Sequence, residues 1–341
     1  MRLRMARSST RIRKRYSVRR HNFELRISHM SQKVIYSEPT GGLCNRMGAL
    51  NYAYLFAKEY NCRLVILWKD NIEAACHYED IFKPFEDDNV KVVNLDYYKE
   101  TPKELLKSGR IFSLAARGIK HCAFNLYFRY RRSNETELTY ETDGVSRVEA
   151  DAVNHNLIEK FINSDKRWCL ISSYQCADLA HDYSALQFQD RFEDAVRALY
   201  EKQFGAFATE EEYKSYIRCN VIGVHVRRGD HKYAIANNPL DMFVGKMQKR
   251  IDANPEVKFY LASDGADVIE YMQKHFPGRV IINEGAELSR KSKSGMENAI
   301  IDLLALSKTG GIIGSFGSTF SDMASYIGGT DLEYSNSKGK D

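Results

Sequence analysis

The second half of the chain alternates short apolar runs with amphipathic stretches, and this alternation constrains the fold more than any other feature. Strands are expected at 221–226, 257–262, 279–282 and 311–313, and helices near 240–252, 266–276 and 296–308. Alternating units of this length are typical of a parallel sheet that is covered by helices on both faces. Ligands bind such sheets beyond the carboxyl ends of the strands. The sequence therefore predicts an α/β fold with a binding site at that edge.

Polar clusters follow each of these strands. They are His225–Asp230, Ser263-Asp264, Asn283-Glu284 and Ser315–Thr319. The first reads His225-Val-Arg-Arg-Gly-Asp230 and combines two guanidinium groups with an imidazole and a carboxylate. Arginine stays protonated and presents a planar fork of donors that matches phosphate oxygens. The cluster indicates a site for a phosphorylated ligand, and a salt-bridged strand end without a ligand is the alternative.

The two arginines of this cluster are expected to differ in role. Residues 225 and 227 point to one side of an extended chain, whereas residues 226 and 228 point to the other. We therefore expect Arg227 to face the ligand and Arg228 to be paired structurally, with Asp230 as its candidate partner. At the next strand end, Asp264 is expected either to cap the following helix or to bind the ligand.

A second βαβ unit opens the folded part of the chain. A strand at Lys33–Tyr36 leads through Thr40-Gly-Gly-Leu-Cys-Asn-Arg-Met47 into a helix that ends near Tyr60, and another strand follows at 63–68. The amides of a glycine-rich turn and of a helix N-terminus can face a phosphate. The glycine spacing does not match the dinucleotide fingerprint, so a tight structural turn is the alternative.

The net charge of +5 is unevenly distributed along the chain. Residues 1–29 carry ten Lys/Arg and one Glu, which leaves the rest slightly acidic and argues against a nucleic-acid-binding body. We expect this segment to be either a disordered extension or an electrostatic tether to anionic lipid at the inner face of a membrane. Seven cysteines without a C-x-x-C pair are typical of a reduced, cytoplasmic protein.

The stretch 110–132 holds six Lys/Arg and no acidic residue. Its interleaved aromatic residues are Phe112, Phe124, Tyr127, Phe128 and Tyr130. One interpretation is a helix with a buried aromatic side and a solvated basic side. The other is a basic amphipathic face that meets an anionic membrane or a lipid-linked substrate.

The sequence lacks the spacing of several common catalytic motifs. The cysteines and histidines do not have zinc spacing, and Glu86-Asp-Asp88 is the nearest approach to a D-x-D metal motif. The P-loop and the G-x-S-x-G motif of hydrolases are also missing. Phosphate binding by arginine without a metal is the remaining interpretation.

The string Val221–Asp230 resembles the H-x-R-R-x-D motif of the fucosyltransferase superfamily that contains α1,6-fucosyltransferases, the nodulation fucosyltransferase and protein O-fucosyltransferases. Three more stretches resemble that family: Gly41–Arg46, Phe259–Asp264, and Ala299–Asp302 with Ser315–Phe320. The resemblance implies a GT-B fold, in which two Rossmann-like domains with parallel sheets face a cleft. It also implies a GDP-sugar donor and inversion at the sugar without a metal or other cofactor.

The resemblance further implies individual roles. Arg227 would bind the β-phosphate, His225 would help to position the diphosphate, and Asp302 would accept hydrogen bonds from the guanine. Ser318 and Thr319 would contact the phosphates. The full predicted donor-binding set is Gly41, Gly42, Asn45, His225, Arg227, Asp264, Asp302, Ser318 and Thr319.

One departure from the family concerns the catalytic base. Some α1,6 members carry a Lys and a Glu just after the motif, where this chain has His231 and Ile235. Asp230, His231 and Asp241 are the candidate bases, and the pKa of a histidine lies nearest the working pH. A solvated loop histidine without a catalytic role is the alternative for His231.

These expectations describe a cytoplasmic glycosyltransferase that moves fucose from GDP-fucose to a hydroxyl of a glycan, which can be lipid-linked. Residues 30–215 would form the N-terminal, acceptor-side domain and residues 216–330 the nucleotide-sugar-binding domain, with 331–341 as a tail. Two alternatives stay open: transfer from another GDP-sugar, and a non-catalytic GDP-sugar-binding interaction module.

Overall fold

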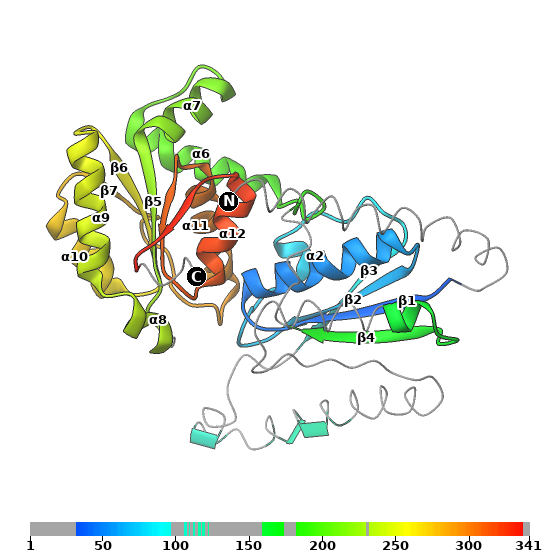
Figure 1. Ribbon diagram of the computed structural model, residues 1–341. Coiled ribbons are helices and arrows are strands. Elements are labelled where there is room, and N and C mark those ends of the chain that lie inside the picture. Colours follow the sequence, from blue (N-terminus) through cyan, green and yellow to red (C-terminus); the bar gives the residue numbers. More distant parts are fainter. Residues whose placement is uncertain are drawn as a thin grey trace.

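The computed structural model describes residues 32–96, 159–173, 182–229 and 232–336, and the positions 106, 107, 109, 112, 115, 116, 118, 119 and 122. These residues form two separate parallel sheets, each packed against helices (Figure 1). The predicted α/β, GT-B-like class is confirmed. Among the described helices, none combines the length and the apolar character that crossing a bilayer requires.

The N-terminal sheet has the strand order β3-β2-β1-β4. Its strands are β1 (Val34–Pro39), β2 (Arg63–Asp70), β3 (Val90–Asp96) and β4 (Trp168–Ser173). Ile35, Leu64 and Ile66 share a core with helix α2 (Leu43–Glu59), while Val65 and Leu67 belong to a cluster on the other face. Because both faces are buried, β2 appears in the sequence as an unbroken apolar run.

The C-terminal sheet has the order β7-β6-β5-β8-β9, and all its pairs are parallel. Its strands are β5 (Val221–Val226), β6 (Lys258–Ser263), β7 (Val280–Ile281), β8 (Ile312–Gly314) and β9 (Leu332–Tyr334). The chain builds outward from β5 through β6 to β7 and then returns to the other side of β5 with β8. The carboxyl ends of β5 and β8 therefore form the switch point at which sheets of this kind bind ligands.

Helices cover both faces of this second sheet. On one face lie α9 (Leu240–Ala253) and α10 (Ala266–His275), which share a core with Val224 and Val226. On the other lie α6 (Asp190–Phe204), α7 (Glu210–Asn220), α11 (Lys293–Lys308) and α12 (Thr319–Gly328). The short α8 (Lys232–Asn237) connects β5 to α9.

The predicted domain boundaries need two corrections. The segment expected to be a tail from residue 331 begins with β9, which pairs with β8 and forms the edge of the sheet. The expected boundary at 215/216 falls inside α7. Periodicity misses β9 because a three-residue edge strand is held by backbone pairing and offers too few side chains for a pattern.

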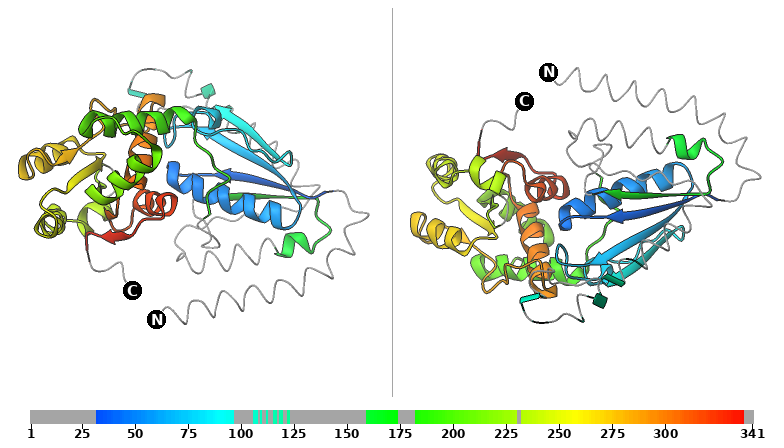
Figure 2. Two further views of the ribbon diagram at one scale, coloured as in Figure 1. Left: turned by 90° about the horizontal axis from the view of Figure 1, so that it is seen from above. Right: turned by 90° about the horizontal axis from the view of Figure 1, so that it is seen from below.

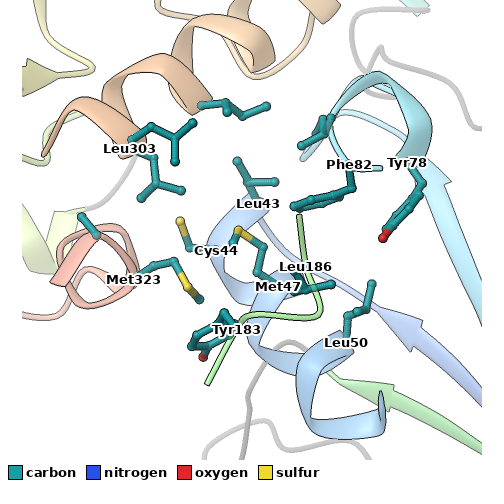
Figure 3. Packing of buried hydrophobic residues seen from close by; sticks show 14 of the residues in the cluster. Leu43, Cys44, Met47, Leu50, Tyr78, Phe82, Tyr183, Leu186, Leu303 and Met323 are labelled. Carbon is teal, nitrogen blue, oxygen red and sulfur yellow. The ribbon is translucent and has the colours of Figure 1, made fainter. Parts of the chain in front are cut away.

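The two sheets share one continuous core. Leu43, Cys44 and Met47 of α2 lie in the same apolar cluster as Leu303 of α11 and Met323 of α12 (Figure 3). Views from above and below also show the start of α2 beside α12 (Figure 2). The glycine-rich turn before α2 is thereby held next to the second domain.

Ion pairs fasten the same junction at its surface. Asp80 ends a short 3-10 helix, η2 (Tyr78–Asp80), and its carboxylate accepts a hydrogen bond from Lys293 of α11 at 2.6 Å. Arg191 of α6 donates to Glu297 of α11 and to the carbonyl of Asp80, both at 2.7 Å. These contacts fix the orientation of the first domain against α11.

Candidate active site

Serine hydroxyls tie together the strand ends at the switch point. The amide of Arg227 donates to Ser315 Oγ at 2.9 Å, and the Ser315 hydroxyl donates to the carbonyl of His225 at 3.2 Å. On the other side of β5, the Ser263 hydroxyl donates to the carbonyl of Val226 at 2.8 Å. Three neighbouring strands thus end in a fixed relation to one another, which gives the arginines after β5 a rigid base.

Arg227 is held by the end of β6. Its guanidinium forms an ion pair with one oxygen of Asp264, and the other oxygen accepts from the amide of Arg228 at 2.6 Å. Asp264 does not cap α10, because Gly265 is the N-cap and its amide donates to the Ser263 hydroxyl. The capping alternative is therefore wrong, and Asp264 orients an arginine whose side chain is still 21% exposed.

Arg228 points into the protein and contacts other backbone. Its guanidinium donates to the carbonyl of Asn238 at 3.0 Å and to that of Arg227 at 3.3 Å. Partial burial lowers the pKa of Arg228, and the nearby Asp267 opposes this effect. Asn238 is a partner that the sequence did not suggest, while the expected partner, Asp230, lies outside the described residues.

Asn238 clamps the turn between β8 and α12. This fully buried side chain accepts from the amide of Phe316 at 2.7 Å and donates to the carbonyl of Phe316 at 3.0 Å. It also accepts from the Ser335 hydroxyl at 2.5 Å. Sequence reasoning missed Asn238 because an asparagine before a proline is typical of an ordinary turn.

His225 lies beneath the arginines as a buried, neutral group. Its Nδ1 is 2.7 Å from Ser321 Oγ, and its ring stacks on Phe320. Burial, reinforced by the positive charge of Arg227, lowers the pKa of His225 to about 3. At neutral pH the imidazole can therefore contribute hydrogen bonds to a ligand but no positive charge.

Helix α12 begins at this edge and offers main-chain amides. Its N-cap, Ser318, is nearly buried and makes no side-chain capping bond within the helix, and Gly317 before it has a φ of 79°. Thr319 is the first helical residue. A helix N-terminus carries partial positive charge and favours a bound anion. Ser318 and Thr319, the predicted phosphate contacts, therefore lie at the N-terminus of α12, just after β8.

The glycine-rich turn of the first domain is shaped by a buried arginine. Arg46 donates to the carbonyls of Gly41 and Lys69 and to Asn71 Oδ1. Burial lowers the pKa of Arg46 to about 10, and Glu73 is the largest opposing influence. Because Gly41 has a φ of 77°, a side chain there would strain the turn. Arg46 is a second residue whose structural role the sequence motif did not reveal.

The turn leads directly into α2. Gly42 is the N-cap, and Asn45 lies half-buried in the first turn of the helix. Burial raises the pKa of Cys44, and the negative charge of Asp322 on α12 raises it further. Cys44 also shares an apolar cluster with Met323 and Ala324, which places the start of α2 beside α12. Two helix N-termini from different domains therefore lie close to each other.

Asp302 of α11 is partly buried and contacts the middle of β6. Its carboxylate accepts from the Tyr260 hydroxyl at 2.6 Å, and burial raises the pKa of Asp302 to about 7. Tyr260 pairs in register with Gly223, three residues before the carboxyl end of β5. The predicted contact between Asp302 and a guanine stays a prediction.

The candidate bases are only partly visible. Asp230 and His231 fall outside the part of the chain that the structure describes. Asp241 lies in the first turn of α9 and accepts from the Tyr271 hydroxyl of α10 at 3.3 Å. Among the described residues, no group of three or more His, Cys, Asp or Glu side chains is placed to hold a metal ion.

Solved structures of similar architecture carry known activities, although no family model and no curated protein matches this sequence. The fucosyltransferase NodZ from Bradyrhizobium is 17% identical, with a TM-score of 0.54 over 86% of this chain and 92% of that one. NodZ co-crystallized with GDP, described as an α-1,6-fucosyltransferase, is 19% identical, with a TM-score of 0.52 and the same coverage of both chains. Arabidopsis thaliana FUT1 in complex with GDP is 13% identical, with a TM-score of 0.50 over 91% of this chain and 72% of that one.

This chain has the fold of these fucosyltransferases. The match spans both sheets, since it covers more than four fifths of the chain. At identities below 20% the likeness concerns architecture, and the assignment of an activity depends on the residues at the switch point.

Proposed function

We propose that this protein is a glycosyltransferase that moves fucose from GDP-fucose to a hydroxyl of a glycan, with inversion at the sugar and without a metal ion. The observation that carries the proposal is Arg227, which is fixed by Asp264 at the switch point of the C-terminal sheet. The fold supports the same proposal, because structures of that fold have been obtained with GDP and with GDP-fucose.

The leaving group explains why a fixed arginine is needed. When the bond between the sugar and the β-phosphate breaks, negative charge develops on GDP. A preorganised cation stabilises that charge most where water is excluded. Arg227 supplies the cation, and the amides at the start of α12 supply further hydrogen bonds. Inversion then follows from attack by the acceptor hydroxyl on the sugar face opposite GDP.

The second candidate function is binding of a GDP-sugar without transfer, because no catalytic base has been identified among the described residues. Ile235 of α8 is 41% exposed at the position where some relatives are expected to carry a glutamate. An apolar side chain cannot take a proton from the acceptor hydroxyl. If neither Asp230 nor His231 replaces it, the protein would bind a GDP-sugar without transferring it.

The lack of disulfides among the described cysteines supports a cytoplasmic location as part of this proposal. The six cysteines that the structure describes are free thiols, and four of them are buried in the core. Disulfides are common in oxidising compartments and rare in the cytosol.

Donor binding and turnover test the proposal separately. In buffer with excess EDTA, GDP at millimolar concentration is expected to raise the melting temperature, and GDP-fucose is expected to release GDP when a glycan acceptor is added. GDP release from GDP-mannose, measured in the same way, tests whether another GDP-sugar is the donor. An unchanged melting temperature would refute nucleotide binding, whereas binding without acceptor-dependent GDP release would favour the binding module. Faster release from GDP-mannose would instead identify a different sugar.

A further inference from the structure

Several helical positions described between residues 106 and 122 present apolar side chains to solvent. Phe112, Ala115, Ala116 and Ile119 are all helical and exposed, and Phe112 is 92% and Ile119 69% exposed. Their spacing of three, four and seven residues places them along one stripe of a helix. We call these four residues the apolar stripe.

Exposure on this scale distinguishes the stripe from the rest of the described surface. Leu106, which is also helical, is 58% exposed, while the large hydrophobic residues exposed elsewhere in the described ranges do not exceed 44%. Single exposed hydrophobic residues are normal on a protein surface, but a contiguous set marks an interaction site. The stripe therefore needs a partner that offers apolar contact.

The surrounding charge selects among the possible partners. The sequence from 110 to 132 contains six Lys/Arg and no Asp or Glu, and Lys107 just before it is exposed. A second copy of this chain would bring the same positive charge to the contact, which disfavours self-association. An anionic bilayer offers both negative headgroups and an apolar layer beneath them.

We propose that the apolar stripe docks on the surface of a bilayer that contains anionic phospholipids. Phe112 and Ile119 would insert at the boundary between headgroups and acyl chains, and the exposed Lys107 would contact the headgroups. This site is separate from the switch point, and the proposal does not depend on the sugar transferred.

A tryptophan reporter can test the stripe itself. The two native tryptophans, Trp68 and Trp168, are buried, so Phe112→Trp adds a single solvent-exposed indole. Vesicles of phosphatidylcholine with phosphatidylglycerol are expected to shift its emission to shorter wavelength, and brominated acyl chains are expected to quench it. Leu288→Trp, at an exposed position far along the chain, is the matched control and should not respond.

Flotation with the same vesicles measures the contribution to binding. Phe112→Glu is expected to lower the fraction bound at least about tenfold, because it removes a large apolar side chain and adds a repelled charge. Leu288→Glu in the full chain should bind like the unmodified protein. An emission at position 112 that vesicles do not change would overturn the proposal, even if the basic residues 1–29 bring the protein to the vesicles. A shift that depends on protein concentration without lipid would overturn it in favour of self-association.

Discussion

The carboxylate of Asp264 binds both arginines of the β5 end, because one oxygen pairs with the Arg227 guanidinium and the other accepts from the amide of Arg228. Asp264 directly follows β6, so the orientation of Arg227 depends on the register between β5 and β6 and not only on its own rotamer. A guanidinium that is ordered in advance loses less entropy when a phosphate binds. Substitutions of Arg227 and of Asp264 distinguish the contribution of the guanidinium from that of the carboxylate that orients it.

Arg227→Ala is expected to abolish the thermal stabilisation that GDP produces, because it removes the cation at the switch point. Asp264→Asn keeps an oxygen for the amide of Arg228 but loses the ion pair, so we expect the affinity for GDP to fall roughly three- to tenfold. Isothermal titration calorimetry measures both effects. Arg250→Ala removes an exposed arginine that pairs with Glu333, and an equal loss of affinity in this control would contradict the role of Arg227.

Gly229→Ala is expected to lower the affinity for GDP in addition to its modest cost in folding free energy. Gly229 has a φ of 44°, and a Cβ there would lie 2.5 Å from Asp264 Oδ2. The new methyl group would push Asp264 away from Arg227. Gly278→Ala is the matched control, since its φ is 70° but no atom lies within 4 Å of its Cβ.

Both glycine variants should lose about 1 kcal/mol of folding free energy from the unfavourable backbone conformation. Urea unfolding measures that loss, and titration with GDP measures the second effect. Only the Gly229 variant is expected to lose nucleotide affinity. Equal GDP affinities in the two variants would show that the contact with Asp264 does not matter for binding.

Much of the fold could be predicted because buried parallel strands leave a strong pattern. The apolar runs at 63–68 and 221–226 lie in β2 and β5, and the expected helix at 240–252 is α9. β3, α7 and β9 were not predicted. β3 carries polar residues such as Asn94 between its apolar ones, and its neighbour supplies the pairing. β3 and β9 are held mainly by pairing with a neighbouring strand, which leaves no local pattern, whereas α7 buries only Tyr213 and Ile217 and so offers a short one.

The site shows the same limit. Strand alternation predicts different roles for Arg227 and Arg228, and their guanidinium groups do have different partners, although the predicted contact of Arg227 with a ligand stays a prediction. The partners of these arginines come from positions that are distant in sequence: Asp264 is about 36 residues away and Asn238 about 10. The clamp from Asn238 to Phe316 spans 78 residues and requires the closed sheet. No local signal contains such a contact.

Asn238→Ala is expected to destabilise the fold by about 1–3 kcal/mol, because it removes the side-chain partner of the partly buried amide and carbonyl of Phe316. Urea unfolding measures this change. Release of the β8–α12 turn should also reduce GDP affinity. Asn220→Ala is the control, since this partly exposed side chain donates to the carbonyl of Tyr216 within α7, and it should leave both properties nearly unchanged. A stable Asn238 variant would contradict the proposed clamp.

Asp302→Asn is expected to stabilise the protein at alkaline pH. Burial raises the pKa of Asp302 to about 7 in the folded state, against 3.8 for the ordinary carboxyl. Between these values the unfolded chain loses the proton while the folded protein keeps it, so this group lowers stability as pH rises from about 4 to 7. Above pH 7 the penalty is constant and amounts to at most about 4 kcal/mol.

The amide of the Asp302→Asn variant avoids that penalty and still accepts from Tyr260. Urea unfolding at pH 5 and pH 8 should show a larger gain over the unmodified protein at pH 8, and equal gains would contradict the raised pKa. The substitution is expected to lower GDP affinity even though it raises stability. If the carboxylate accepts from guanine, it must be ionised, so affinity in the unmodified protein should rise as pH increases through 7. The variant should bind GDP weakly at every pH in spite of its greater stability, and unchanged GDP affinity would assign Asp302 to the core alone.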